Sequence, residues 1–353
     1  MRDMPGEAEE IAPWFPPNRI RQPVCLRLPR QFDPQVGTTS GAQLRSRVAH
    51  PKKLDFAELS MASDPLPGIE NPVQLPPTPP FDEQLQKALD KALYAGGSPV
   101  AQKIRDFLNG TWIGEPLHVI LTDIPIGAWT VALVFDGLDS RAERSRFADA
   151  ADASLAIGLV GAAGAAVAGI VDWSDVDPPS RRVGLLHGIL NLTGAALYTT
   201  SLVLRRKNSR KQGRLVSALG YAVMTVSAHL GGKMVYEQRV GVDRTAGQDF
   251  PKEFTAVMPR EALEDSKPTR AEYQGTPILL VRKGDQIFAL AETCSHFSGP
   301  LSEGKLEGDS IVCPYHASRF SLADGRVING PAVHPQPCLE VRIQDGNIEV
   351  RRP

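Results

Sequence analysis

The stretches CSHFSGP at residues 294–300 and CPYHASRF at residues 313–320 decide the interpretation of this chain. Each holds one cysteine and one histidine, separated by one residue in the first stretch and by two in the second. Two thiolates and two imidazoles can hold a binuclear iron–sulfur centre, the sulfurs on one iron and the nitrogens on the other. A tetrahedral zinc site is the alternative, but zinc ligands usually come in like pairs, and these pairs are mixed. The four donors are Cys294, His296, Cys313 and His316.

Glycine and proline follow each ligand pair, at Gly299-Pro300 and Gly330-Pro331. Glycine permits the close approach of backbone that a cluster requires. With these flanks, residues 250–353 resemble the Rieske [2Fe–2S] family. The resemblance implies one [2Fe–2S] cluster per chain, held by the four donors named above. It also implies neutral histidine ligands whose second ring nitrogens face solvent and exchange a proton when the iron changes charge.

The resemblance further implies hydrogen bonds that tune the cluster. In the family, a serine hydroxyl donates to a bridging sulfide and a tyrosine hydroxyl donates to a cysteine sulfur. Here Ser318 stands at the serine position, and Phe320 stands where the tyrosine would be. High-potential members also join their two ligand loops by a disulfide, at the positions that Gly299 and Tyr315 occupy here. These departures imply a potential in the lower half of the family range, which spans about −150 to +300 mV.

Short apolar runs dominate the chain from Phe254 onward. They predict strands, joined by turns at Gly284-Asp285 and Asp345-Gly346. We therefore expect an all-β, antiparallel Rieske-type domain over residues 250–353, with the two ligand loops at one tip. The predicted strands include residues 278–281, 287–290, 339–343 and 348–350.

The first 81 residues are rich in proline and show no sustained hydrophobic period. This composition predicts a disordered tail without a cleavable signal peptide. Met61 could be the translation start, so whether residues 1–60 are translated stays open. Residues 82–110 predict two short amphipathic helices that lie on a membrane surface or on the next domain.

Four apolar stretches follow within residues 111–245. Each is about as long as a helix that crosses a membrane, so they predict an all-α four-helix transmembrane bundle before the β domain. The alternative is a soluble bundle, but residues 153–171 show no polar face. Gly161, Ala165 and Gly169 recur at four-residue steps and predict close helix packing. The stretches are 116–138, 153–171, 183–204 and 215–236.

Residues 110–118, 122–127 and 231–236 resemble an uncharacterised bacterial four-helix membrane domain that is often fused to a Rieske module. This resemblance implies a multi-pass protein of a bacterial cell membrane and no particular activity. The side on which the cluster lies stays open. Loops 139–149 and 205–214 are basic, which places the cluster outside by the positive-inside rule, whereas the chain lacks an export signal.

Two classes of function are disfavoured by the sequence: nucleic-acid binding and oxygenase catalysis. A net charge of −1 argues against a nucleic-acid partner. Only 37 residues follow His316, and they hold one histidine, His334, so an oxygenase's mononuclear iron site cannot be built there. Whether the chain is an enzyme stays open, and we expect an electron carrier with membrane lipid and redox proteins or quinone as partners.

Three histidines, His118, His187 and His229, fall in the membrane half nearest the cluster. We expect hydrogen bonds to backbone or water for them, with Asp123 as a partner for His118. A bis-histidine haem or a quinone site is the alternative, which would make the chain a quinol-oxidising or haem-binding oxidoreductase subunit. A third hypothesis is a redox or iron sensor without turnover.

Overall fold

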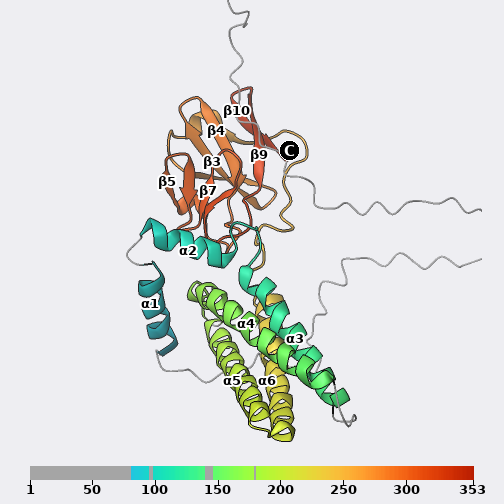
Figure 1. The fold of residues 1–353 in the computed structure, drawn as a ribbon. Coiled ribbons are helices and arrows are strands. Elements are labelled where there is room, and N and C mark those ends of the chain that lie inside the picture. The colour runs from blue at the N-terminus through green and yellow to red at the C-terminus, as the bar shows by residue number, and fades with distance from the viewer. Residues whose placement is uncertain (1–80, 95–97, 140–145, 179) are drawn as a thin grey trace, which may run out of the picture.

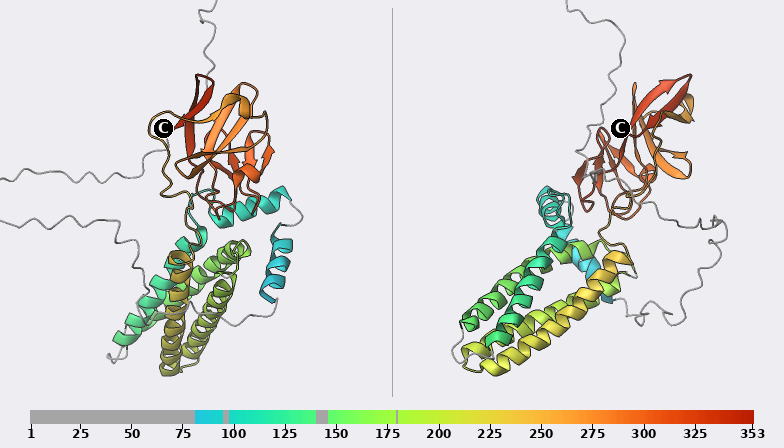
Figure 2. Two further views of the ribbon diagram at one scale, coloured as in Figure 1. Left: turned by 180° about the vertical axis from the view of Figure 1, so that it is seen from behind. Right: turned by 90° about the vertical axis from the view of Figure 1, so that its right-hand side faces the viewer.

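The computed structural model describes residues 81–94, 98–139, 146–178 and 180–353. The predicted disordered tail lies outside the described residues, except for Phe81, and so does the question about residues 1–60. A helical bundle and a β domain lie end to end, with one short helix between them (Figure 1, Figure 2). The helices are α1 (Phe81–Tyr94), α2 (Pro99–Asn109), α3 (Leu117–Asp139), α4 (Phe147–Ser174), α5 (Ser180–Arg206) and α6 (Arg210–Tyr236).

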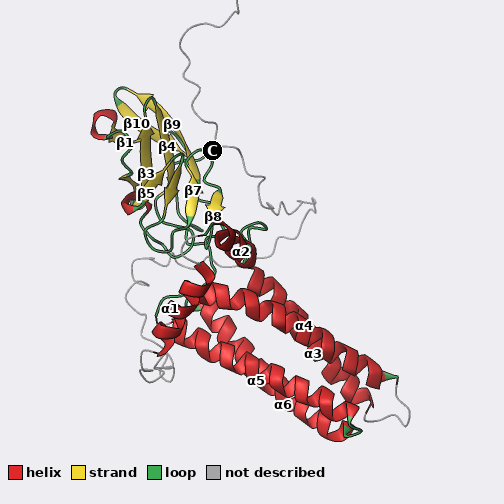
Figure 3. Ribbon diagram, turned by 60° about the vertical axis from the view of Figure 1, so that its left-hand side comes forward, coloured by secondary structure: helices red, strands yellow, loops and turns green. Residues whose placement is uncertain are grey.

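Two helical hairpins, α3–α4 and α5–α6, form the bundle (Figure 3). Small residues allow the helices to approach closely, as the sequence predicts. A Cβ atom on Gly161 of α4 would lie 2.5 Å from the side chain of Ile124 on α3. A Cβ on Gly158 would lie 2.1 Å from the Trp129 indole. Glycine is therefore required at both contacts.

Among the described residues, α3, α4 and α6 are long and apolar enough to cross a membrane. The prediction of four apolar spans differs from the structure at α5, which lies in the bundle but is less apolar. Its exposed face carries hydroxyl groups, and Thr193, Thr199 and Thr200 each donate to the carbonyl four residues earlier. Such bonds satisfy polar groups where water is scarce.

A buried ion-pair network closes the end of the bundle farthest from the β domain. The side chain of Arg205 on α5 is fully buried and donates to both carboxylate oxygens of Asp136 on α3. It also lies 2.9 Å from Asp152 on α4. Arg210 and Arg214 lie 3.0 and 2.8 Å from Asp139. Arginines that the sequence assigns to a basic loop are thus neutralised by carboxylates on the helix ends.

The β domain holds two antiparallel sheets, which confirms the predicted all-β class. The turns Gly284-Asp285 and Asp345-Gly346 join strands as predicted. The larger sheet has the order β1 (Thr255–Pro259), β10 (Asn347–Arg351), β9 (Cys338–Gln344), β4 (Gln286–Ala291), β3 (Thr276–Lys283) and β2 (Thr269–Tyr273). The smaller has the order β5 (Lys305–Glu307), β6 (Ser310–Val312), β7 (Arg319–Ser321) and β8 (Val327–Asn329).

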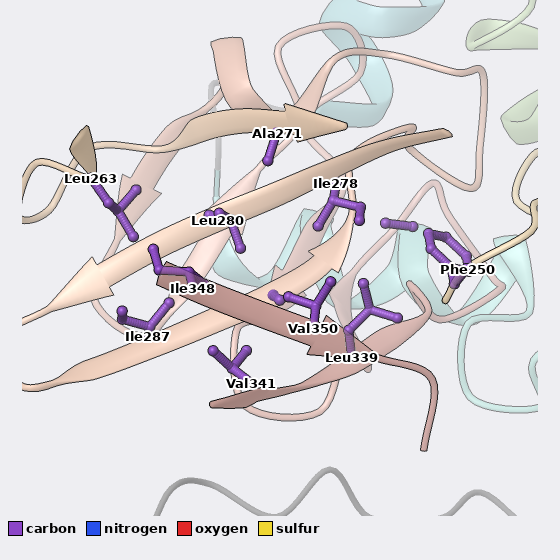
Figure 4. Packing of buried hydrophobic residues seen from close by; sticks show 12 residues of the cluster. Phe250, Leu263, Ala271, Ile278, Leu280, Ile287, Leu339, Val341, Ile348 and Val350 are labelled. Carbon is purple, nitrogen blue, oxygen red and sulfur yellow. The ribbon is translucent and has the colours of Figure 1, made fainter. Parts of the chain in front are cut away.

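Strand β3 is buried on both faces, which explains its continuous apolar run. Ile278 and Leu280 point into one core, drawn in Figure 4, which lies within the six-stranded sheet. Leu279 and Val281 point into a second core, between the two sheets. Successive side chains of a strand alternate between its faces, so one strand supplies both cores. The second core includes Cys294 and Cys313, and this anchors the ligand loops to the sheets.

Candidate iron–sulfur site

The two ligand loops share one backbone pattern. The first follows β4, and the second joins β6 to β7. The Cys294 N–H donates to the Gly299 carbonyl at 2.9 Å, and the Cys313 N–H donates to the Ser318 carbonyl at 2.8 Å. In each loop the cysteine N–H therefore donates a hydrogen bond to the carbonyl of the residue five positions later. The loops are closed alike although their histidines stand at different spacings.

Each loop also holds a non-glycine residue in the left-handed region. Ser298 has φ of 59° and Ala317 has φ of 57°. Their N–H groups donate to the carbonyls of Cys294 and Cys313, at 3.0 and 3.2 Å. Such conformations are costly for L-residues and concentrate at functional sites. The resemblance placed Ala317 among the residues that hydrogen-bond the cluster, whereas no sequence feature singled out Ser298.

The donor atoms of the four candidate ligands converge on this tip. The Cys294 and Cys313 side chains are buried free thiols. The imidazole rings of His296 and His316 lie perpendicular, with centroids 5.1 Å apart. Both Nδ1 atoms are buried without a hydrogen-bond partner among the described residues. An unsatisfied buried nitrogen is costly unless it binds something, so two sulfurs and two orphaned nitrogens fit a [2Fe–2S] cluster.

The protein environment favours the ionisation states that ligands need. Burial, together with charge repulsion from His316, Arg105 and Arg244, holds the pKa of His296 well below its usual value, so the imidazole is neutral. The hydrogen bond from Cys294 lowers the pKa of Cys313 to about 7. The same contact and burial raise the pKa of Cys294. Cys313 is thus the first thiol to become a thiolate, the form that binds metal.

Gly299 lies against the opposite ligand loop. A Cβ atom at this position would lie 2.7 Å from the Cys313 sulfur and 3.1 Å from the Tyr315 ring. Only glycine fits there. Positions 299 and 315 face each other, as the resemblance implied, and neither residue is a cysteine.

Ser318 is fully buried beside the second loop. Its Oγ accepts a hydrogen bond from the Ala332 N–H at 3.0 Å. This occupies an acceptor position and leaves the hydroxyl proton for donation elsewhere. Phe320 is also fully buried, in the core that contains both cysteines, and has no hydroxyl group to donate.

Gln336 holds the first ligand loop in place. Its Oε1 accepts from the Ser295 N–H at 2.8 Å, and its Nε2 donates to the carbonyls of Ala291 and Thr293 at 2.9 and 2.8 Å. The residue is buried, so these bonds are shielded from water. The His334 carbonyl accepts from the Ser295 hydroxyl at 2.7 Å. No local motif signalled Gln336.

The tip that carries the ligands faces α2 (Figure 1, Figure 3). Asp106 of α2 accepts from the Gly330 N–H at 2.8 Å and from the Asn329 amide at 3.1 Å. The His316 side chain is only 19% exposed, and its Nε2 lies 4.0 Å from Asp177. The segment between α4 and α5 therefore lies beside this nitrogen.

The structure brings together two of the three membrane histidines. The rings of His118 and His187 lie 6.3 Å apart, and each Nδ1 lies 2.8 Å from a backbone carbonyl, as expected. His229 is exposed on α6. Asp123 is also exposed, and His118 Nδ1 pairs with the Ala165 carbonyl instead, so the predicted partner is wrong.

Two families match consecutive parts of the chain. Residues 114–244 match a predicted membrane protein family, DUF2231. Residues 253–340 match the Rieske [2Fe-2S] domain. Both agree with the helical and β regions described above.

Similar proteins include Rieske-type ferredoxins. Ferredoxin CarAc of Metapseudomonas resinovorans is 38% identical over 74 residues, which is 21% of this chain and 69% of the relative. The 3-phenylpropionate/cinnamic acid dioxygenase ferredoxin subunit of Photorhabdus laumondii is 37% identical over 92 residues, 26% and 86% of the two chains. The solved ferredoxin of carbazole 1,9a-dioxygenase from Nocardioides aromaticivorans is 27% identical, with a TM-score of 0.28, over 29% of this chain and 100% of that one. Through its C-terminal domain the chain belongs to the Rieske [2Fe–2S] family, and it is an electron-transfer protein with one cluster and a membrane-associated helical domain.

Proposed function

We propose that the chain is a multi-pass carrier of single electrons, anchored in a bacterial cell membrane through a domain spanning residues 111–245. Cys294 and Cys313 would bind one iron of the cluster, and His296 and His316 the other. The observation that carries this proposal is the pair of orphaned Nδ1 atoms beside two buried thiols. When bound, the cluster supplies one-electron chemistry.

The surrounding residues set the charge at the site. Reduction adds one negative charge. Arg105, whose pair with Asp175 is 2.6 Å long, and Arg244 both place positive charge near the His296 ring. Asp177 places negative charge 4.0 Å from the His316 Nε2. Ser318 can donate its hydroxyl proton toward the cluster. These groups determine the electrostatic field at the cluster, at the interface between the two domains.

The partners follow from the tip's position and from the relatives. The relatives are named as ferredoxin subunits of dioxygenases, so a soluble redox protein is the expected partner on one side. The tip also packs on α2, which supports a donor on the membrane side, with lipid around the bundle. A quinol-oxidising subunit is the second candidate. The observation that favours it is that the His316 Nε2 lies 4.0 Å from Asp177, in the segment between α4 and α5.

Full-length protein in detergent tests this proposal. We expect it to remain with membranes after a carbonate wash and to exchange electrons with a ferredoxin reductase or an oxygenase component. Asp106→Ala removes the hydrogen bonds that hold Gly330 and Asn329. It should therefore speed exchange with a soluble partner, while the surface variant Asp324→Ala should not. Protein that is soluble without detergent would contradict membrane anchoring, and slower exchange in Asp106→Ala would favour the quinol route.

A further inference from the structure

We propose that His118 and His187 are the axial ligands of a b-type haem inside the helical bundle. This goes beyond the cluster and beyond the carrier role, since neither requires a second cofactor. Four features of the bundle support this haem site: the distance between the two imidazole rings, the hydrogen bonds of their Nδ1 atoms, the glycines that lie against the rings, and the number of metal-binding side chains nearby.

The first observation is the spacing of the rings. His118 lies on the first turn of α3 and His187 on α5, so the two hairpins each contribute one imidazole. The ring centroids are 6.3 Å apart and the ring planes are perpendicular. A metal between two Nε2 atoms keeps the centroids about 6 Å apart, since a metal–imidazole bond is about 2 Å and the nitrogen lies about 1 Å from the ring centre. The observed separation matches this value.

The second observation concerns the nitrogens. The Nδ1 of His118 lies 2.8 Å from the Ala165 carbonyl, and the Nδ1 of His187 lies 2.8 Å from the Ser227 carbonyl. A carbonyl only accepts, so each Nδ1 carries the proton and each Nε2 carries the lone pair. Asn191 agrees with this tautomer, because its amide lies 3.0 Å from the His187 Nε2 and can donate to it. Iron bound at this nitrogen would replace that hydrogen bond. Histidines that bind metals are usually oriented in this way by a carbonyl on the other nitrogen.

The third observation is a glycine behind each ring. A Cβ atom on Gly169 of α4 would lie 2.7 Å from the His118 Nδ1. A Cβ on Gly231 of α6 would lie 3.1 Å from the His187 Cε1. Each imidazole thus fits against bare backbone of the neighbouring helix. Larger residues at these positions would force both rings to move.

The fourth observation is that the described part of the chain offers only two imidazole ligands here, which favours haem over a bare metal ion. No group of three His, Cys, Asp or Glu side chains suited to one metal ion lies within the described ranges. A bare ion with two imidazoles would lack ligands, since protein sites usually supply three or four. Haem iron brings four pyrrole nitrogens of its own and needs only two axial ligands. An apolar bundle also suits the macrocycle, and ionisable residues in such bundles are usually functional.

The haem would lie at the end of the bundle that carries the cluster. Thr111, seven residues before His118, lies against Gly330 on the tip. Asp177, which faces His316, lies ten residues before His187. Two redox centres at one end of the bundle would suit one-electron transfer between a membrane donor and the Rieske domain.

The test uses full-length protein, expressed with a haem precursor and purified in detergent. We expect one haem b per chain by pyridine haemochrome analysis and a low-spin optical spectrum. His118→Ala and His187→Ala should each lose the haem, whereas His229→Ala, exposed on α6, should keep it. His118→Met should keep the haem and raise its potential, because thioether ligation does so; this separates loss of a ligand from loss of folding.

The cluster provides an independent readout in the same samples. Wild-type protein with a Rieske EPR signal but without haem would overturn this inference and leave the proposed function intact. Haem that survives both alanine substitutions would overturn it too. Bound quinone without haem would show that the histidine pair serves a different ligand.

Discussion

The Nε2 atom of His316 lies 4.0 Å from the Oδ1 atom of Asp177. The first residue belongs to the β domain and the second to the segment that joins α4 to α5. A candidate cluster ligand therefore shares its electrostatic environment with the membrane domain. The potential of the cluster should depend on both domains.

Asp177→Asn should raise the midpoint potential. Removing a negative charge near the site favours the reduced state. The Asp177 side chain is 61% exposed, so solvent screening limits the effect. An exposed pair is worth up to about 1 kcal/mol, which corresponds to at most about 40 mV for one electron. EPR-monitored titration measures the change, with Asp309→Asn on the β5–β6 turn as the control. An unchanged potential would show that this contact does not form in solution.

Ser318 can donate a hydroxyl hydrogen bond to the cluster, whereas Phe320 cannot. With one donor instead of two, we expect a cluster reduction potential below about +100 mV at pH 7. Ser318→Ala should lower it further, since the hydroxyl proton is available for donation. Phe320→Tyr should raise it by adding a donor within the core that holds both cysteines. A wild-type value above about +200 mV would contradict the donor argument, and an unmoved potential in Ser318→Ala would show that Ser318 faces elsewhere.

Gly299→Ala should abolish or destabilise the cluster. The new Cβ would lie 2.7 Å from the Cys313 sulfur, so the ligand loops must separate. Iron and acid-labile sulfide per chain measure the loss. Ser298→Gly is the matched control, because glycine relieves the φ of 59° without adding atoms. A full cluster in Gly299→Ala would show that the loops are less closely packed than described.

Arg205→Ala should strongly destabilise the bundle. It leaves the buried Asp136 carboxylate without its partner, at a cost of about 3–5 kcal/mol. Thermal unfolding in detergent measures the effect, and Arg206→Ala, exposed at the same end, should change little. The double variant Arg205→Met with Asp136→Leu should recover much of the loss. Equal effects of Arg205→Ala and Arg206→Ala would argue against the network.

The ligand loops could be predicted from sequence because their signal is local. Cysteines, histidines and glycines at fixed spacing are visible within thirty residues, and the strands follow from apolar runs and turns. Gln336 could not be predicted, since it reaches back 41 residues to Ser295. The same holds for Asp106, which binds Gly330 across 224 residues. Such contacts arise only from tertiary packing.

The membrane histidines show the same limit. Helical spacing suggested Asp123 as the partner of His118, because the two lie on one helix. The nearest acceptor is instead the carbonyl of Ala165 on α4, opened to the ring by Gly169. A backbone carbonyl leaves no signature in the sequence. The pairing of His118 with His187 likewise depends on how the two hairpins meet.

Metal analysis of the full-length protein, combined with EPR after reduction, tests the central claim most directly. The account predicts two irons, two acid-labile sulfides and a Rieske-type signal in each chain. Cys313→Ser and His316→Ala should abolish that signal, and His334→Ala should retain it, since only its backbone carbonyl holds Ser295. One zinc per chain without acid-labile sulfide would contradict the account.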